Sequence, residues 1–227
     1  MSSTNQLQVF VKAPSPGQVK RRLQPEISRN DAVNLYKAMA EDLVARFRNV
    51  LFFDMKIIFW PPDSRDDIEG WLGTEYEYEP QDGSNLGERM LHGFEYAFAH
   101  GYQKATIIGT DIPTLTVESL REAFVRLESC DVVLGPSHDG GYYLIGLKEL
   151  HPKLFEGMDW GSERVREQTL HAAEELRLSV HQLEMRRDID TYADALQFWL
   201  SLRQSEQHPV NTRMPRLYNA LKKLFQN

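Results

Sequence analysis

The chain has 227 residues, of which 41% are hydrophobic and 26% are charged, and its formal net charge at pH 7 is −7. This length and composition suit one large domain, and the acidic balance argues against general binding to nucleic acid. A single cysteine, Cys130, excludes an internal disulfide and a zinc cluster built from several cysteines. Since no run approaches the ~20 apolar residues of a membrane span and no signal-peptide pattern is present, we expect a cytoplasmic protein that does not bind membranes.

An apolar strand is predicted at residues 7–11, and a short basic loop follows it at residues 12–23. The loop contains four Lys or Arg residues, two prolines and Gly17. Because proline fixes φ and glycine permits unusual backbone geometry, we expect a shaped loop rather than the start of a helix. Residues 1–25 carry these four cations and no Asp or Glu. In an acidic chain this concentration indicates a site for a small polyanion such as a nucleotide, with a solvated basic loop as the alternative.

Strand and helix signals alternate along most of the chain, which predicts an α/β fold with a largely parallel sheet. Ser28 and Asn30 are the candidates to cap the first helix, and Thr116 is predicted to cap the helix that runs to about residue 129. We expect a domain at residues 1–203, and at residues 204–227 a polar linker followed by a terminal helix. The predicted strands are residues 7–11, 55–60, 75–79, 104–110, 131–136, 142–147 and 179–183, and the predicted helices end near residues 48, 72, 100, 129, 176, 202 and 225.

Two segments that contain glycine are candidates for contact with a ligand. Gly83 and Gly87 lie where a predicted helix begins, and the first amides of a helix suit phosphate oxygens or polar ligand edges. The segment at residues 137–141 has two consecutive glycines, which let the backbone pass close to a ligand. An ordinary helix cap and a simple hairpin are the alternatives for these two segments.

Three aspartates are candidates for metal binding. Asp111 directly follows an apolar strand, and ligands of parallel α/β sheets gather at the carboxyl ends of strands. Asp188 and Asp190 are separated by one residue and can share a divalent cation. The alternatives are a turn acid at position 111 and, for the pair, a favourable charge before the next helix.

Five ordered motifs carry a family resemblance that covers roughly residues 7–202. They are Lys12-Ala13-Pro14 with Pro16-Gly17 and Val19-Lys20, Gln81 with Gly83 and Leu86-Gly87-Glu88-Arg89-Met90, Gly109-Thr110-Asp111-Ile112-Pro113, Asp139-Gly140-Gly141-Tyr142, and Asp188-Ile189-Asp190-Thr191. With them the chain resembles the small GT-A-like transferases of the nucleotide-diphospho-sugar transferase superfamily, which are glycosyltransferase-like or similar to phospholactate guanylyltransferase. One departure is Arg21, where relatives usually carry Thr.

The resemblance implies a single-domain, GT-A-like (Rossmann-like) three-layer sandwich with a mostly parallel, mixed central sheet. It also implies a metal-dependent transferase that uses a nucleotide donor. Because the basic loop can hold a triphosphate tail, we expect transfer of a nucleotidyl group from an NTP to a small phosphate- or hydroxyl-bearing acceptor. Glycosyl transfer from a nucleotide-diphospho-sugar and a non-catalytic nucleotide-binding module are the alternatives. The expected partners are therefore an NTP or nucleotide sugar and a small-molecule acceptor, and no nucleic acid.

The motifs also imply roles for individual residues. We expect Mg²⁺ or Mn²⁺ on Asp111 together with Asp190 or Asp188, and we expect Lys20 and Asp111 to be catalytic. Lys and Arg of the basic loop would hold phosphate oxygens, the segment after Gln81 would border the nucleoside, and residues 139–142 would line the acceptor side. The residues expected to bind the nucleotide or the acceptor are Lys12, Pro16, Gly17, Lys20, Arg22, Gln81, Gly83, Leu86, Gly87, Asp139, Gly140, Gly141 and Tyr142.

Overall fold

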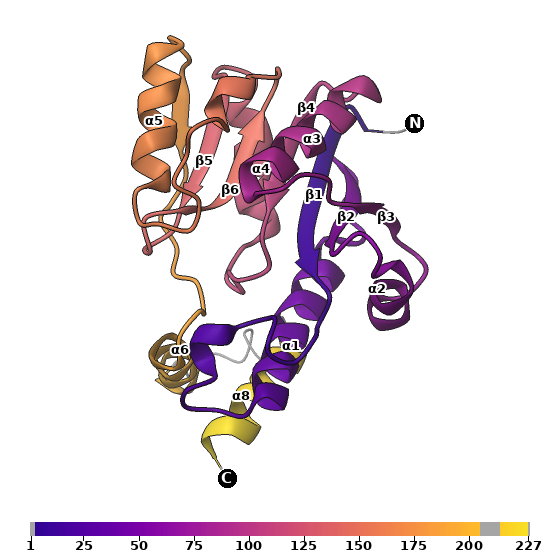
Figure 1. Ribbon diagram of the computed structural model, residues 1–227, viewed down its shortest axis with the longest axis vertical. Coiled ribbons are helices and arrows are strands. Elements are labelled where there is room, and N and C mark those ends of the chain that lie inside the picture. The colour runs from indigo at the N-terminus through magenta and orange to yellow at the C-terminus, as the bar shows by residue number, and fades with distance from the viewer. Residues whose placement is uncertain (1–2, 205–213, 227) are drawn as a thin grey trace.

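The computed structural model describes residues 3–204 and 214–226, which form helices around a seven-stranded sheet (Figure 1). The strand order in the sheet is β3-β2-β1-β4-β6-β5-β7. The strands are β1 (Asn5–Lys12), β2 (Asp54–Trp60), β3 (Glu77–Pro80), β4 (Lys104–Ile108), β5 (Val132–Pro136), β6 (Tyr142–Leu147) and β7 (Val180–Gln182). The helices are α1 (Arg29–Phe47), α2 (Arg65–Leu72), α3 (Leu86–Ala99), α4 (Val117–Arg126), α5 (Val165–Glu175), α6 (Tyr192–Gln204) and α8 (Pro215–Phe225).

Strand direction divides the sheet into two halves. In the parallel half, β1 pairs in parallel with β2 and β4, and β2 pairs in parallel with β3. In the mixed half, β6 runs antiparallel to both β4 and β5, while β5 and β7 are parallel. Six strands therefore end at one edge of the sheet, and β6 begins there.

Alternation of side chains along the strands builds a core on each face of the sheet. One core packs Leu7 and Val9 of β1 with Phe47 of α1 and Phe124 of α4. The opposite core consists of side chains from β4, β5, β6, α3 and α5, among them Ile107, Leu134, Ile145, Phe94 and Ala173. Helices thus cover both faces of the sheet, and the predicted three-layer α/β sandwich is confirmed.

A third cluster of buried side chains joins α1 to α6 and α8, which lie together at one end of the molecule (Figure 1). Trp199 of α6 and Leu217 of α8 pack there against Met39 of α1. The backbone N–H of Leu217 also donates a hydrogen bond of 2.9 Å to the buried carboxylate of Asp42. The predicted linker at residues 204–212 lies outside the described residues, apart from Gln204, which ends α6.

The predicted elements match the observed ones closely, because their local signals are strong. Ser28 caps α1 by accepting a hydrogen bond of 3.0 Å from the backbone N–H of Asp31, and Thr116 caps α4 in the same way with Ser119. Asn85 caps α3 by accepting from the N–H of Glu88. Across residues 3–204 and 214–226, no helix combines the length and the apolar character needed to span a membrane.

Candidate functional site

Loops from both halves of the sheet meet at the edge where six strands end. Lys12 ends β1, Asp111 follows β4, and Ser137 follows β5. Because β6 is reversed, its first residue, Tyr142, lies at the same edge. This is the position where open α/β sheets bind their ligands, and it brings together residues that are far apart in the sequence.

The basic loop is attached to the sheet by backbone contacts. Tyr36 of α1 donates a hydrogen bond of 3.0 Å from its hydroxyl to the carbonyl of Lys12 and accepts one of 2.7 Å from the N–H of Lys12. Burial raises the pKa of Tyr36, so its hydroxyl stays protonated and remains a donor. The N–H of Ala13 donates to the carbonyl of Trp60 at 2.7 Å, which fixes the start of the loop beside β2.

Lys20 is the buried cation of this loop. Its backbone has φ 48°, in the left-handed region, and its side chain is only 3% exposed. The ammonium lies 2.8 Å from Oδ1 of Asp111 and 3.5 Å from Oδ1 of Asp190, and it donates a hydrogen bond of 2.6 Å to the carbonyl of Ile189. One cation therefore joins two of the aspartates that the sequence singled out.

The two acidic segments are also held by a second set of contacts. The N–H of Ile189 donates to the backbone carbonyl of Asp111 at 3.0 Å, so the two chain segments run beside each other. Arg22, which is largely exposed, pairs with Oδ2 of Asp190 at 2.8 Å. The carboxylate of Asp190 thus receives a different cation on each oxygen, which fixes its orientation.

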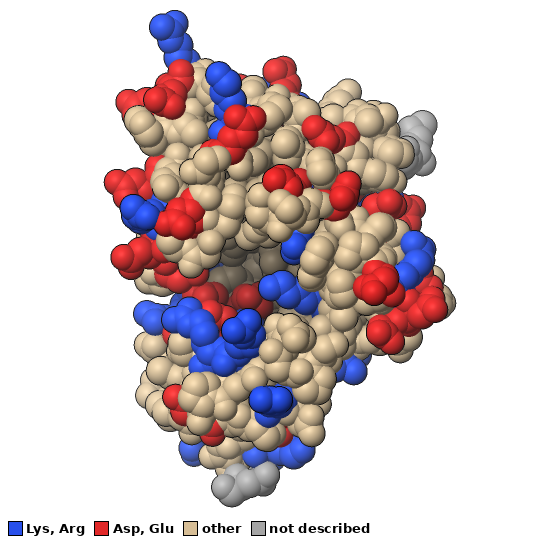
Figure 2. Space-filling view, in the orientation of Figure 1, with Lys and Arg blue, Asp and Glu red and all other residues tan. Residues whose placement is uncertain are grey.

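A cleft of about 460 Å³, which we name the basic cleft, opens beside Lys20. The residues expected from the sequence that line it are Lys12, Lys20, Arg22, Gln81, Leu86, Asp111 and Asp190. Arg21 and Arg89 add further cations to its wall. Figure 2 shows a hollow on this face of the molecule with Lys, Arg, Asp and Glu side chains gathered around it. Concentrated positive charge in a cleft favours a polyanionic ligand.

Gln81 lines the basic cleft but is itself buried. Its side-chain amide donates to the carbonyls of Ile58 at 2.9 Å and Val11 at 3.4 Å, and its N–H donates to the carbonyl of Phe59. These bonds attach the segment before α3 to the ends of β1 and β2. The structure therefore gives Gln81 a part in shaping the cleft.

Arg89 and Trp60 form a stacked pair that sequence reasoning missed. The guanidinium carbon lies 3.4 Å from the centre of the indole ring, and Nε donates to the carbonyl of Gly83 at 3.0 Å. Arg89 belongs to the motif Leu86-Gly87-Glu88-Arg89-Met90, three residues after Leu86 and therefore on the same side of a helix. This spacing could have identified Arg89 as a site residue. Trp60 ends a predicted strand, and ligands of parallel α/β sheets gather at the carboxyl ends of strands. The argument that selected Asp111 therefore applies to Trp60 as well.

A second cavity, of about 300 Å³, adjoins the basic cleft, and we name it the acidic cavity. Leu86 and Asp111 line both of them. The other residues expected from the sequence that line the acidic cavity are Asp139, Tyr142 and Asp188. Most of its remaining wall is apolar. Asp111 therefore lies where the two spaces meet.

Two of these carboxylates have distinct surroundings. Asp139 is exposed, and its Oδ1 accepts hydrogen bonds from the N–H of Gly141 at 3.0 Å and from the hydroxyl of Ser137, which holds the side chain in place. Asp188 is half-buried, and burial, followed by the neighbouring charge of Asp139, raises the pKa of Asp188 above its usual value. The acidic cavity thus holds aspartates that repel one another.

The remaining residues expected at the site line neither cavity; they are Pro16, Gly17, Gly83, Gly87, Gly140 and Gly141. Gly140 has φ +88°, and a side chain there would meet the backbone of Glu163. A side chain at Gly87 would meet the indole of Trp160 at 2.5 Å. In the structure these two glycines permit close packing between segments, and their neighbours Leu86 and Asp139 line the cavities.

The arrangement of the acids suits a hard divalent cation. Asp111 and Asp190 already share one cation, the ammonium of Lys20, so their oxygens converge on a common position. Within residues 3–204 and 214–226, no group of three or more His, Cys, Asp or Glu side chains is arranged to hold a metal by itself. Mg²⁺ is commonly bound by one or two carboxylates together with substrate phosphates, and a pair of carboxylates beside a basic cleft fits that donor set.

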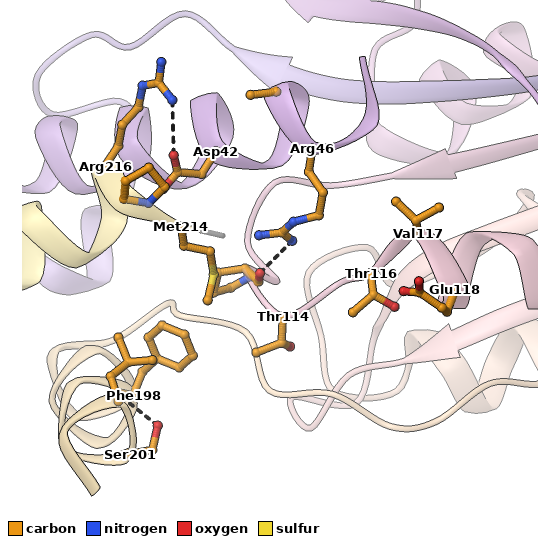
Figure 3. A pocket seen from close by; sticks show the side chains of 14 residues that line it. Asp42, Arg46, Thr114, Thr116, Val117, Glu118, Phe198, Ser201, Met214 and Arg216 are labelled. Atoms are coloured by element: carbon orange, nitrogen blue, oxygen red, sulfur yellow. Dashed lines mark hydrogen bonds and ion pairs between the residues drawn. The ribbon is translucent and has the colours of Figure 1, made fainter. Parts of the chain in front are cut away.

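A larger cavity, of about 850 Å³, lies between α1, α4, α6 and the start of α8 (Figure 3). Arg46 there donates to the carbonyl of Pro113 at 2.9 Å, and Arg216 pairs with Asp42 at 3.3 Å. None of the site residues expected from the sequence lines this cavity. We therefore place the candidate site at the two smaller spaces that share Asp111.

A family model described as "Uncharacterized protein conserved in bacteria (DUF2064)" matches residues 43–162. No curated protein matches the sequence significantly. The matched segment contains Asp111 and the region around α3, whereas the basic loop and Asp190 lie outside it.

Solved structures show the same fold over nearly the whole chain. A protein of Desulfovibrio desulfuricans G20, provisionally assigned as a nucleotide-diphospho-sugar transferase, is 30% identical, with a TM-score of 0.87 and coverage of 97% of this chain and 98% of that chain. The 4-diphosphocytidyl-2C-methyl-D-erythritol synthase of Anaerococcus prevotii DSM 20548 is 11% identical, with a TM-score of 0.56 and coverage of 88% and 97%. A CMP:2-keto-3-deoxy-manno-octonic acid synthetase solved with CTP is 8% identical, with a TM-score of 0.56 and coverage of 90% and 100%. The last two share the fold alone.

Proposed function

Because this chain belongs to the bacterial family described as DUF2064 and is a transferase that uses a nucleotide, we propose that it is a metal-dependent nucleotidyltransferase. It would transfer a nucleotidyl group from an NTP to a small acceptor and release pyrophosphate. The similar protein of Desulfovibrio desulfuricans G20 is provisionally assigned as a nucleotide-diphospho-sugar transferase, and this likeness supports the nucleotide part of the proposal.

One observation carries the proposal: Lys20 is held between Asp111 and Asp190 on the wall of a cleft rich in Lys and Arg. A triphosphate needs cations along its length, and Lys12, Arg21 and Arg22 line the same cleft as Lys20. When a nucleotide enters, its phosphate oxygens would compete with the two carboxylates for the ammonium of Lys20. Asp111 and Asp190 would then be available to hold Mg²⁺ or Mn²⁺.

The metal would neutralise negative charge that develops on the phosphates during transfer. The side chains of the protein would bind and position the donor. Lys20 and Arg22 would hold phosphate oxygens from the loop side, while Gln81 keeps the segment before α3 against the sheet. The stacked pair of Arg89 and Trp60 would lie beside the nucleoside, since Nε of Arg89 donates to the carbonyl of Gly83 in the segment expected to border the nucleoside.

Glycosyl transfer from a nucleotide sugar is the second candidate. It would release a nucleoside diphosphate, whose two phosphates need fewer cations than the basic cleft provides. The number of cations in the cleft therefore favours the triphosphate donor.

The direct test is the identity of the released product. NTPs and nucleotide sugars would be incubated separately with the protein, Mg²⁺ or Mn²⁺, and a panel of small acceptors, and the products read by mass spectrometry. Release of pyrophosphate from an NTP is the expected result. Release of a nucleoside diphosphate from nucleotide sugars alone would favour glycosyl transfer, and nucleotide binding without any product would indicate a binding module.

Asp111→Asn tests the metal assignment within the same assay. The substitution keeps the size of the side chain and removes its charge, so we expect metal-dependent transfer to fall by about 10²–10³-fold. Asp66→Asn is the matched control, because Asp66 is exposed on α2 and lines neither cavity. Unchanged transfer and unchanged nucleotide affinity in Asp111→Asn would show that Asp111 does not hold the metal.

A further inference from the structure

The charged side chains of the acidic cavity all have the same sign. Asp111, Asp139 and Asp188 line it, and among the residues that the structure describes no Lys, Arg or His does so. The basic cleft next to it has the opposite character, with cations over most of its charged wall. Since the two spaces meet at Asp111, a donor in one and an acceptor in the other would experience very different electrostatic surroundings.

The cation nearest to this wall is already engaged. Lys20 contacts Asp111 at 2.8 Å, but its ammonium also contacts Asp190 and the carbonyl of Ile189, and Lys20 does not line the acidic cavity. The proposed roles of Lys20 and Asp111 direct that ammonium and the metal toward the phosphates of the donor. Among the described residues, Asp139 and Asp188 therefore remain as carboxylates without an ion pair on the acceptor side, and Lys20 acts on Asp188 only as a minor neighbouring charge.

Most of the remaining wall of the acidic cavity is apolar and suits an apolar ligand. Phe10, Met90, Ile107, Ile112 and Leu144 line it, and its volume of about 300 Å³ suits a small molecule. The polar groups are few, and one of them is fixed: Asp139 Oδ1 accepts bonds from Ser137 and Gly141, which leaves Oδ2 for another donor. An alcohol group supplies such a donor, and a phosphate dianion does not.

Resting on the proposed nucleotidyl transfer, we propose that the acceptor is an apolar alcohol without an anionic group, and that the acidic cavity discriminates against phosphorylated acceptors. The alcohol oxygen forms a bond to the α-phosphorus of the NTP as the bond between that phosphorus and the α,β-bridging oxygen breaks. The bonding electron pair leaves with pyrophosphate, and the proton of the alcohol passes to a carboxylate of the cavity. A phosphate monoester would instead bring two negative charges beside Asp139 and Asp188.

The test compares alcohols with their own phosphate monoesters. Aliphatic and aromatic alcohols, among them 1-hexanol and 3-phenylpropanol, would each be paired with the corresponding monoester. Binding of both members to the intact protein would be measured by ligand-observed NMR, first alone and then with Mg²⁺ and a non-hydrolysable NTP analogue. We expect each alcohol that binds to do so at least about tenfold more tightly than its monoester, because like charges repel across a short distance.

Substitutions connect this preference to the cavity. The double variant Asp139→Asn with Asp188→Asn keeps the side-chain shapes and removes two charges, so the ratio of affinities is expected to move toward equality. Asp66→Asn, an exposed change on α2, is expected to leave the ratio as it is in the unaltered protein. A circular dichroism spectrum and a thermal melt of each variant establish that the comparison is made on folded protein.

Two results would overturn the inference: monoesters that bind as tightly as their alcohols, or no binding of any alcohol with or without the nucleotide analogue. A ratio that stays the same in the double variant would also overturn it, because the preference would then come from elsewhere. Failure of the proposed function is separate, since it would appear as absent nucleotide affinity and as absent pyrophosphate release with every acceptor of the panel. Transfer to phosphorylated acceptors would leave the proposed function in place and reject this inference alone.

Discussion

Apart from Asp111, which follows β4 and lines both spaces, the parallel and mixed halves of the sheet contribute opposite charges to the candidate site. The parallel half supplies the basic loop that follows β1, and this loop carries Lys12, Lys20 and Arg22. The mixed half contributes Asp139 from the turn between β5 and β6, and the chain beyond β7 contributes Asp188. The two spaces therefore differ in the charge of their walls, which is mainly positive in the basic cleft and negative in the acidic cavity.

The reversed strand β6 explains why this separation is possible. If β6 ran parallel to its neighbours, a crossover would be needed between β5 and β6, whereas an antiparallel pair needs only a short turn. That turn, residues 137–141, lies at the same edge as Asp111 and carries Asp139 with its supporting bonds from Ser137 and Gly141. The acidic cavity therefore depends on the local geometry of a hairpin.

Lys20 is the residue whose loss should affect this arrangement most. Lys20→Met keeps an unbranched side chain but removes the cation that contacts Asp111, Asp190 and the carbonyl of Ile189. We expect NTP-dependent transfer to fall by about 10²–10³-fold, because the loss of one preorganised donor to a developing charge has effects of this size. Single-turnover release of pyrophosphate is the measurement.

Arg22→Met provides the matched comparison for Lys20→Met. Arg22 also contacts Asp190, at 2.8 Å, but its side chain is 65% exposed. An exposed ion pair contributes little, so a loss of transfer of about tenfold or less is expected. Equal losses in both variants would contradict the special position of Lys20 and would point to the general charge of the loop.

Much of the site could be predicted from sequence because its residues stand beside strong local signals. Asp111 follows an apolar strand, and the basic loop concentrates charge where the rest of the chain is acidic. The contact between Lys20 and Asp190 could not be predicted, since it joins positions 170 residues apart and depends on the order of the strands. The stacking of Arg89 on Trp60 could not be predicted for the same reason, because a ring and a guanidinium from different elements meet only in the folded protein.

Gly87 tests the packing between the two sides of the site. Trp160 lies against the first turn of α3, and an added methyl group at position 87 would meet its indole at 2.5 Å. We expect Gly87→Ala to lower the free energy of unfolding by about 1–3 kcal/mol, because the indole or the helix must shift. Denaturant unfolding measures the effect. Binding of nucleotide and of alcohol should both weaken, since Leu86 lines both spaces.

Gly70→Ala is the control for that substitution. Gly70 is exposed within α2, and an added methyl group there would meet nothing within 4 Å. Alanine favours a helix over glycine by about 0.5–1 kcal/mol, so this variant should be unchanged or slightly more stable. A destabilised Gly70→Ala together with an unaffected Gly87→Ala would show that the close contact with Trp160 does not form.

The smallest effect is expected at Asp131, which joins β5 to β7 within the mixed half. Its carboxylate accepts hydrogen bonds from the hydroxyl of Ser179 at 2.5 Å and the N–H of Ser179 at 2.8 Å, and it pairs with Lys148 at 3.0 Å. These hydrogen bonds from Ser179, with the contribution of Lys148, lower the pKa of Asp131 from 3.8 to about 2. Asp131→Asn should lower the free energy of unfolding by about 1 kcal/mol at neutral pH, since the group is partly exposed to solvent.

The dependence of that difference on pH has a definite sign. Because the pKa of Asp131 is lower in the folded state than in the unfolded state, its stabilising contribution is complete above pH 3.8 and is lost as the pH falls through about 2. The gap in free energy of unfolding between the unaltered protein and Asp131→Asn should therefore narrow over that interval in urea titrations. A gap that stays constant down to pH 2 would mean that the carboxylate charge is not the source of the stability. Nucleotide and acceptor binding at neutral pH should not change, because Asp131 lines neither the basic cleft nor the acidic cavity.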